Sequence, residues 1–186
     1  MSERIGKDMI EIRWHGRGGQ GAFTASKLLG AAAVTDGLYA LSFPSFGPER
    51  RGAPIQAFTK IDDKKITDRS VITKGDYIIY LDETLYSPAA KEDLKAGGLI
   101  FVNTKDIDRY TDKNVIAIDA DSISKEIIGR AVSNTAMLAT LIAHTHIVDS
   151  ESAKKVLKNY LPEKIVEKNK SVIDEIITIE RSNNND

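Results

Sequence analysis

The sequence of 186 residues contains no cysteine. This absence excludes disulfide bonds, a cysteine nucleophile, and any zinc site or iron–sulfur cluster held through cysteines of this chain. An excess of one charge is also missing, because 26 Lys and Arg residues stand against 27 Asp and Glu residues, a formal net charge of −1. The near-neutral balance argues against a protein that binds nucleic acid through a basic surface.

Long hydrophobic runs are missing as well. The longest nearly apolar stretch covers residues 28–34, far short of the roughly 18 residues that a transmembrane helix requires. No apolar segment follows Met1-Ser2-Glu3-Arg4, so we expect no export signal, no membrane contact and a cytoplasmic location. The content of 41% hydrophobic and 28% charged residues is typical of a folded protein. We expect one domain over residues 1–186, with flexible ends at 1–8 and 182–186.

Strands and helices alternate along the first two thirds of the sequence. Alternating or continuous apolar residues predict strands at 9–14, 38–41, 55–61, 76–82, 99–103 and 115–119. Small and apolar residues at helical spacing predict a helix from Ala22, directly after the first strand, and a further helix is expected at 88–95. The last third predicts three more helices, with apolar stripes at 137–142, 153–160 and 172–177 and with Asn134 as an N-cap.

This order of elements is typical of an α/β domain. We therefore expect a Rossmann-like, open and mostly parallel sheet with helices on both faces and a helical C-terminal third. The stretch 55–66 fits an antiparallel hairpin around Asp62-Asp63-Lys64. The sheet is consequently expected to be mixed.

A glycine-rich loop links the first strand to the first helix. Its glycines, Gly16-x-Gly18-x-x-Gly21, fit the fingerprint of dinucleotide-binding folds. Glycines let the backbone approach a phosphate, and the free N–H groups of a helix N-terminus attract an anion. The candidate binding residues are those of the whole loop: Gly16, Arg17, Gly18, Gly19, Gln20 and Gly21.

Two comparisons with nucleotide-binding motifs reduce the set of ligands expected for this loop. Nicotinamide-binding folds carry an acidic residue at the end of the second strand, whereas that strand ends at Leu41-Ser42-Phe43 and Asp36 precedes it. Nucleoside triphosphatases need Lys followed by Ser or Thr after the last glycine, where this sequence has Ala22-Phe23. A tight turn without a ligand, another phosphate-bearing ligand, and a partner chain remain as interpretations.

A second unusual loop, residues 43–54, combines aromatic residues, prolines, glycines and the charged trio Glu49-Arg50-Arg51. Paired arginines bind phosphates or carboxylates through two hydrogen bonds at once. Exposed aromatic residues next to arginine are frequent at interfaces. The trio is therefore a candidate clamp for a ligand or a neighbouring subunit, and a solvated loop with a local ion pair is the alternative.

No set of residues in the sequence forms a complete catalytic site. His144 and His146 point to opposite sides of a helix and cannot share a metal, and His15 stands alone beside the glycine loop. The motifs of zinc proteases and serine hydrolases are absent. We therefore expect no catalytic residue and no metal site on this chain, which suggests a subunit that contributes contacts to an active site elsewhere.

The two loops together resemble a known family. Trp14-His15-Gly16-Arg17-Gly18-Gly19-Gln20-Gly21, followed by Ser45-Phe46-Gly47-Pro48-Glu49-Arg50-Arg51-Gly52-Ala53-Pro54, is similar to the gamma subunits of 2-oxoacid:ferredoxin oxidoreductases, above all the pyruvate synthase type. The resemblance covers residues 9–180.

The resemblance implies a heterotetrameric enzyme that converts pyruvate, coenzyme A and oxidised ferredoxin to acetyl-CoA, CO2 and reduced ferredoxin. It implies thiamine diphosphate, Mg and iron–sulfur clusters on the alpha, beta and delta partner chains, and no cofactor on this one. It also implies that residues 16–21 and Glu49, Arg50 and Arg51 contact coenzyme A or a neighbouring subunit. Two other interpretations stay open: a stand-alone nucleotide-binding protein, and the equivalent subunit of a 2-oxoglutarate, 2-oxoisovalerate or indolepyruvate enzyme.

Overall fold

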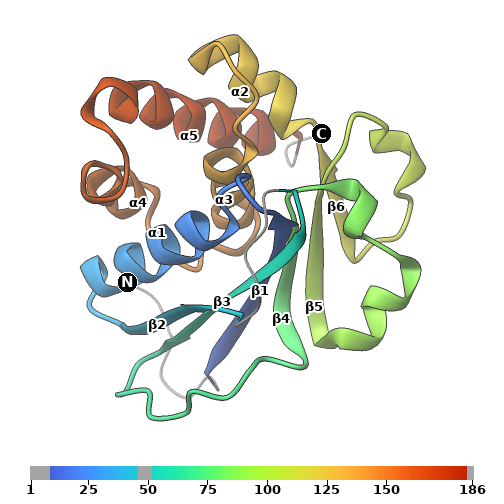
Figure 1. Ribbon diagram of the computed structural model, residues 1–186, viewed down its shortest axis with the longest axis vertical. Helices are drawn as coiled ribbons and strands as arrows, with labels where there is room; N and C mark the ends of the chain where they lie inside the picture. Colours follow the sequence, from blue (N-terminus) through green and yellow to red (C-terminus); the bar gives the residue numbers. More distant parts are fainter. Residues whose placement is uncertain (1–8, 46–51, 184–186) are drawn as a thin grey trace.

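The computed structural model describes residues 9–45 and 52–183, which form one six-stranded sheet with α-helices and short 3-10 helices (Figure 1). The strands are β1 (Ile10–Arg17), β2 (Tyr39–Pro44), β3 (Pro54–Asp62), β4 (Gly75–Tyr80), β5 (Leu94–Asn103) and β6 (Val115–Ile118). The α-helices are α1 (Ala22–Thr35), α2 (Ala120–Ile128), α3 (Ser133–Thr145), α4 (Ser150–Val156) and α5 (Glu163–Asn183). The 3-10 helices are η1 (Glu83–Leu85), η2 (Pro88–Asp93), η3 (Ile107–Arg109) and η4 (Leu157–Asn159).

The sheet is mixed, in the order β2-β3-β1-β4-β5-β6. β1, β4, β5 and β6 are parallel to one another, whereas β3 is antiparallel to both of its neighbours, β1 and β2. The predicted mixed sheet is thus confirmed, but not through the proposed hairpin. Residues 63–74 pair with no strand, and β3 is instead inserted between β1 and β2.

All five α-helices pack on one face of the sheet (Figure 1). Strand residues facing them, such as Ile12, Trp14 and Ile79, are fully buried together with apolar residues of every α-helix. Side chains of a strand alternate between faces, so this face forms the larger hydrophobic core. Small residues bring α1 close to the sheet: a side chain on Gly30 would place its Cβ 2.6 Å from the Ser42 hydroxyl oxygen.

The other face of β4–β6 is covered by 3-10 helices rather than by α-helices. Ile78, Tyr80 and Ile100 form a second, smaller core there with Ala90 of η2 and with Leu85. Both faces therefore carry helices, as predicted, but those of the second face are short 3-10 helices of three to six residues.

Two local predictions are wrong. The expected helix at 88–95 is the 3-10 helix η2, and its last two expected residues already belong to β5. Asn134 is not an N-cap, because α3 begins at Ser133 after Val132. The Asn134 Oδ1 atom accepts a hydrogen bond from the backbone N–H of Thr135 inside the first turn.

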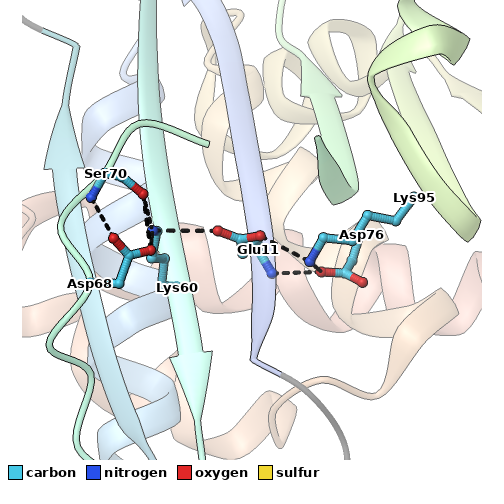
Figure 2. Close-up of polar contacts among 6 residues, drawn as sticks. All are labelled: Glu11, Lys60, Asp68, Ser70, Asp76 and Lys95. Carbon is cyan, nitrogen blue, oxygen red and sulfur yellow. Dashed lines mark hydrogen bonds and ion pairs between the residues drawn. The ribbon is translucent and has the colours of Figure 1, made fainter. Parts of the chain in front are cut away.

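A charged cluster holds residues 63–74, here called the strap, across the second face of the sheet (Figure 2). The fully buried Lys60 ammonium lies 2.5 Å from Asp68 Oδ2 and 3.4 Å from Glu11 Oε1. Lys95 continues the cluster with contacts of 2.9 Å to both Glu11 and Asp76. The cluster thereby ties β1, β3, β4, β5 and the strap together.

None of the helices in the described part of the chain combines the length and the apolar character needed to cross a bilayer.

Candidate functional site

The glycine loop lies where β1 ends and α1 begins, at the carboxyl ends of the parallel strands. Gly16 and Arg17 are the last residues of β1, paired with Ile55 and Pro54 of β3. Gly16 is buried, and a side chain there would place its Cβ 3.3 Å from both Ala22 Cβ and Leu81 Cδ1. The glycine at this position thus lets strand, loop and helix pack closely.

Gly19 and Gly21 both adopt left-handed backbone conformations, with φ of 99° and 84°. Such angles favour glycine because other residues clash with their own backbone. Gly21 is also pressed against α3, since an added Cβ would lie 2.6 Å from Asn134 Nδ2. Gly21 is the N-cap of α1 and has no side chain to satisfy the N–H groups of the first turn.

Gln20 joins the two ends of the glycine loop through hydrogen bonds to Arg17. Its side-chain oxygen accepts a hydrogen bond of 2.7 Å from the backbone N–H of Arg17, and its own backbone N–H donates to the Arg17 carbonyl at 3.0 Å. Its amide nitrogen donates to Asp82 at 3.2 Å. Gln20 is therefore a positioning residue that fixes the loop against the end of β4.

The Arg17 guanidinium bonds to the protein through all three of its nitrogens. Its Nε atom donates to Asp82 at 3.0 Å, Nη2 to the Thr84 hydroxyl at 2.7 Å and Nη1 to the Gly52 carbonyl at 3.2 Å. Three of its five N–H donors are thereby used within the protein. The candidate binding residue Arg17 thus acts as a brace between the two loops.

Asp82 is the acceptor on which these contacts converge. Burial alone would raise the pKa of Asp82, but hydrogen bonds from Thr84 and Gln20 and the charge of Arg17 outweigh it and lower the pKa. The carboxylate is therefore held ionised at neutral pH, as a brace for Arg17 and Gln20 requires.

The second loop meets the glycine loop through its backbone. The Gly18 N–H donates to the Ala53 carbonyl at 2.9 Å, and the Gly52 N–H donates to the Gly18 carbonyl at 3.1 Å. At the start of the second loop, the Ser45 N–H donates to the Gln56 carbonyl at 2.9 Å. The two motifs separated in sequence are thus joined at one place, here called the loop edge: residues 16–21, 52–53, 82 and 84.

The charged trio of the second loop, Glu49, Arg50 and Arg51, lies outside the described residues, as do Phe46, Gly47 and Pro48.

Three residues of the loop edge and its surroundings were not among the predicted site residues: Asp82, Thr84 and Asn134. Asp82 and Thr84 carry a local signal, because Asp followed two residues later by a hydrogen-bond donor is typical of a capping turn. The Asp82 carboxylate accepts hydrogen bonds from both the backbone N–H and the hydroxyl of Thr84. Asn134 has no such signal, since its contact with Gly21 depends on the packing of α3 against α1.

The histidines form no metal site. His15 stacks on Tyr80, with ring centroids 4.6 Å apart, and burial followed by the charge of Arg13 lowers its pKa to about 4. His144 Nε2 lies 2.8 Å from Glu180 Oε2, and His146 follows α3 as its C-cap. Within residues 9–45 and 52–183 no three His, Asp or Glu side chains are grouped to hold a metal ion.

The chemistry that the loop edge offers is binding rather than catalysis. Its ionised groups, Arg17 and Asp82, neutralise each other. The first turn of α1 contains no acidic residue, so the partial positive charge at its N-terminus is not offset there. The arrangement suits contact with an anionic group or with another polypeptide.

Known proteins share this fold. The family model for pyruvate ferredoxin/flavodoxin oxidoreductase matches residues 11–179. Pyruvate synthase subunit PorC of Methanocaldococcus jannaschii is 47% identical over 162 residues, which cover 87% of this chain and 91% of that relative. The common gamma subunit of the pyruvate/ketoisovalerate oxidoreductases of Thermococcus kodakarensis is 41% identical over 175 residues, covering 90% of this chain and 95% of the relative.

A solved structure agrees with the sequence relatives. The crystal structure of pyruvate oxidoreductase subunit PORC from Thermotoga maritima matches with a TM-score of 0.79 and 36% identity, and the match covers 92% of this chain and 97% of that chain. The match spans nearly all of both chains, so it includes the mixed sheet and the helical C-terminal region. The chain belongs to the pyruvate ferredoxin/flavodoxin oxidoreductase family.

Proposed function

We propose that the chain is the gamma subunit of a multi-subunit pyruvate:ferredoxin oxidoreductase. The observation that carries this proposal is the similarity to PorC subunits over almost their whole length, up to 47% identity. The described residues support a packing role, because Arg17 and the backbone hydrogen bonds brace the two loops against each other.

The proposed reaction joins pyruvate and coenzyme A with release of CO2 and transfer of two electrons to ferredoxin. The chemistry of that reaction needs groups that this sequence cannot supply, since it has no cysteine for iron–sulfur clusters. We assign thiamine diphosphate, Mg and the clusters to the alpha, beta and delta subunits. The gamma subunit contributes packing, in the cytoplasm, within a heterotetramer.

Co-expression of the chain with the alpha, beta and delta subunits tests this proposal. We expect one complex that elutes together from a sizing column and reduces ferredoxin with pyruvate and coenzyme A. The isolated chain should show no activity and no affinity for NAD, FAD or nucleotides in calorimetry. Turnover by the isolated chain, or its elution apart from the other subunits, would contradict the proposal.

We further propose that the loop edge and the adjoining Glu49, Arg50 and Arg51 contact coenzyme A or a neighbouring subunit. Support comes from the joined loops, which bring the glycine loop at the N-terminus of α1 next to Gly52 and Ala53, the residues directly after Arg51. Arginines contribute two-pronged hydrogen bonds to phosphate or carboxylate groups. In this proposal Arg17 holds the loops while Arg50 and Arg51 make the contact.

The double variant Arg50→Ala/Arg51→Ala tests this role. Each lost charge-assisted contact is expected to cost about 1.5–3 kcal/mol, so the Michaelis constant for coenzyme A should rise, or assembly should weaken, by at least about tenfold. The matched control is Arg69→Ala/Arg130→Ala, which removes two exposed arginines away from the loop edge. Equal behaviour of the two double variants in both measurements would leave the segment with a structural role only.

A further inference from the structure

The outer strand β2 presents unpaired backbone groups along one edge of the sheet. The hydrogen bond from the Ser45 N–H to the Gln56 carbonyl fixes which residues of β2 bond to β3. Because bonded and non-bonded residues alternate in an antiparallel pair, Tyr39, Leu41 and Phe43 bond to β3. The N–H and C=O groups of Ala40 and Ser42 consequently point outward, where the described residues form no further strand.

Of the features with which proteins usually protect an outer strand, β2 carries a proline only as its last residue, Pro44. Residues 39–43 carry no charge, and their register with β3 is uninterrupted. Tyr39 is 51% exposed. The opposite edge, β6, is only four residues long. Charges, bulges and short strands normally prevent an edge from pairing with another chain, so β2 is the edge that is open to pairing.

A groove runs beside this edge on the face that α1 covers. Its volume is about 490 Å³. Side chains of Ala40 and Ser42 line it together with residues of α1 and of the segment from α4 through η4. The remaining lining residues are Lys27, Gly30, Ala31, Val34, Thr35, Val156, Asn159 and Tyr160. A strand added to β2 would therefore direct every second side chain into this groove.

Lys27 is the only charged residue in that lining. Its ammonium lies 4.8 Å from the ring centroid of Phe23 and 5.6 Å from that of Tyr160. Within the described residues no carboxylate lies within ion-pair distance of it, although most other partly buried lysines have such a partner. A cation held over two rings beside a groove without any carboxylate in its lining favours an incoming carboxylate.

We propose that β2 and this groove bind an extended segment of a partner subunit, which adds a strand to the sheet and places a carboxylate side chain at Lys27. The inference rests on the proposed function, because it requires that the chain assembles with other subunits. A second copy of this chain fits less well, since its own β2 brings no carboxylate and a second Lys27. Strand addition supplies affinity through the backbone, and the groove supplies specificity.

Hydrogen exchange of single amides tests the pairing directly. In the isolated full chain, the amides of Ala40 and Ser42 should exchange rapidly, whereas those of Leu41 and Phe43 are protected by β3. In the assembled complex, we expect the exchange of Ala40 and Ser42 to slow by at least about a hundredfold while Leu41 and Phe43 change little.

The exchange pattern separates this inference from the proposed function. A complex that co-elutes and is active, but leaves Ala40 and Ser42 unprotected, would overturn the strand addition alone. Protection of both amides already in the isolated chain would assign the edge to a segment of the chain itself or to a second copy, and would also overturn it. Failure of the subunits to assemble would remove both proposals.

Charge reversal at Lys27 tests the groove. Lys27→Glu should weaken binding of the chain to the remaining subunits by at least about tenfold, and Lys27→Gln by less. Lys125→Glu, on the exposed side of α2, is the control with the same charge change. Circular dichroism verifies that each variant is folded. Equal affinities of Lys27→Glu and Lys125→Glu would contradict a carboxylate at Lys27.

Discussion

The arginine of the glycine motif supports its own loop through hydrogen bonds to neighbouring segments. Arg17 spans from Asp82 to Gly52, so one side chain links the first strand, the fourth strand and the second loop. The Arg17 side chain is 35% exposed and the Asp82 side chain is 17% exposed, so the ion pair is partly screened from solvent. A charge placed in this way orders the binding surface, and the surface itself is made by the backbone and by neighbouring residues.

Gly19 and Gly21 differ in how much stability the protein should lose when a side chain is added at each position. Gly19→Ala introduces strain of about 1 kcal/mol, because φ is positive but the surrounding space is open. Gly21→Ala should cost at least about 2 kcal/mol, since its Cβ would also collide with the nearly buried Asn134. Urea denaturation of both variants compares the two losses.

The double variant Gly21→Ala/Asn134→Ala serves as the control for this collision. Shortening Asn134 removes the clashing amide, so part of the stability lost in Gly21→Ala should return. Equal losses for Gly19→Ala and Gly21→Ala would show that α3 does not press on the loop.

His15 makes the protein sensitive to mild acid. Its pKa falls from 6.5 to about 4 in the folded state, mainly through burial. Between these two values the unfolded chain binds a proton that the folded chain does not, so stability decreases as the pH falls from 6.5 towards 4. The loss amounts to at most about 3 kcal/mol.

The variant His15→Phe, which keeps a ring next to Tyr80, should lose less stability over this pH range. Thermal unfolding at pH 7, 6, 5 and 4 provides the comparison. His146→Asn is the control, because His146 is exposed at the end of α3 in a left-handed conformation that Asn tolerates. An unchanged acid response in His15→Phe would contradict the buried neutral imidazole.

At the scale of residues, the sequence was sufficient to locate the glycine loop. It was not sufficient to identify the residues that contact this loop. The motif from Gly16 to Gly21 is local, so spacing alone predicted the turn and the helix that follows. Asp82, the partner of Arg17, lies 65 residues along the chain. Such a pairing depends on β1 and β4 becoming neighbours, which no local pattern specifies.

At the scale of elements, continuous patterns predicted the structure well and short ones did not. Alternating residues placed both ends of β3 and the start of β1 to within one residue, because each strand has one face towards the helices, whereas β1 continues three residues beyond its predicted end at Trp14. The segment 88–95 has helix-forming residues but forms only a six-residue 3-10 helix, η2, whose Ala90 packs into the second core. The pairing of β3 depends on tertiary contacts and was not predictable from residues 55–66 alone.

The strap depends on Lys60. The Lys60 ammonium, fully buried, donates to Asp68, and this hydrogen bond holds the pKa of Asp68 well below its usual range. Lys60→Ala should reduce the free energy of unfolding by about 2 kcal/mol, because Glu11 keeps Lys95 as a partner while the strap loses its anchor. Residues 63–74 should then be cut faster by proteases.

Lys65→Ala, an exposed position on the same strap, is the control for this experiment. Chemical denaturation and limited proteolysis measure the two expected effects. Equal stability and equal cleavage of the two variants would show that the buried ammonium does not hold the strap.

The whole molecule is asymmetric in two respects. All described α-helices cover one face of the sheet, and the two edges differ, with an uncharged β2 of six residues on one side and a β6 of four residues on the other. A lysine on an outer strand disfavours pairing with another chain. Tyr39→Lys should therefore weaken assembly with the other subunits by at least about tenfold.

Ile107→Lys is the control for Tyr39→Lys. It also replaces a large apolar residue, which is 45% exposed in η3, by lysine. Sizing chromatography and affinity measurements with the remaining subunits compare the two variants. Similar affinities would mean that the β2 edge takes no part in assembly.

The position of β3 constrains the order in which the chain folds during synthesis. β1 and β2 leave the ribosome first, yet they do not pair with each other, because β3 lies between them. Pairs such as Ile10 with Ile61 and Ala40 with Ile61 form only after β3 is complete. A nascent chain that ends before Pro54 therefore exposes two unpaired strands, and we expect chaperones to engage this interval most strongly.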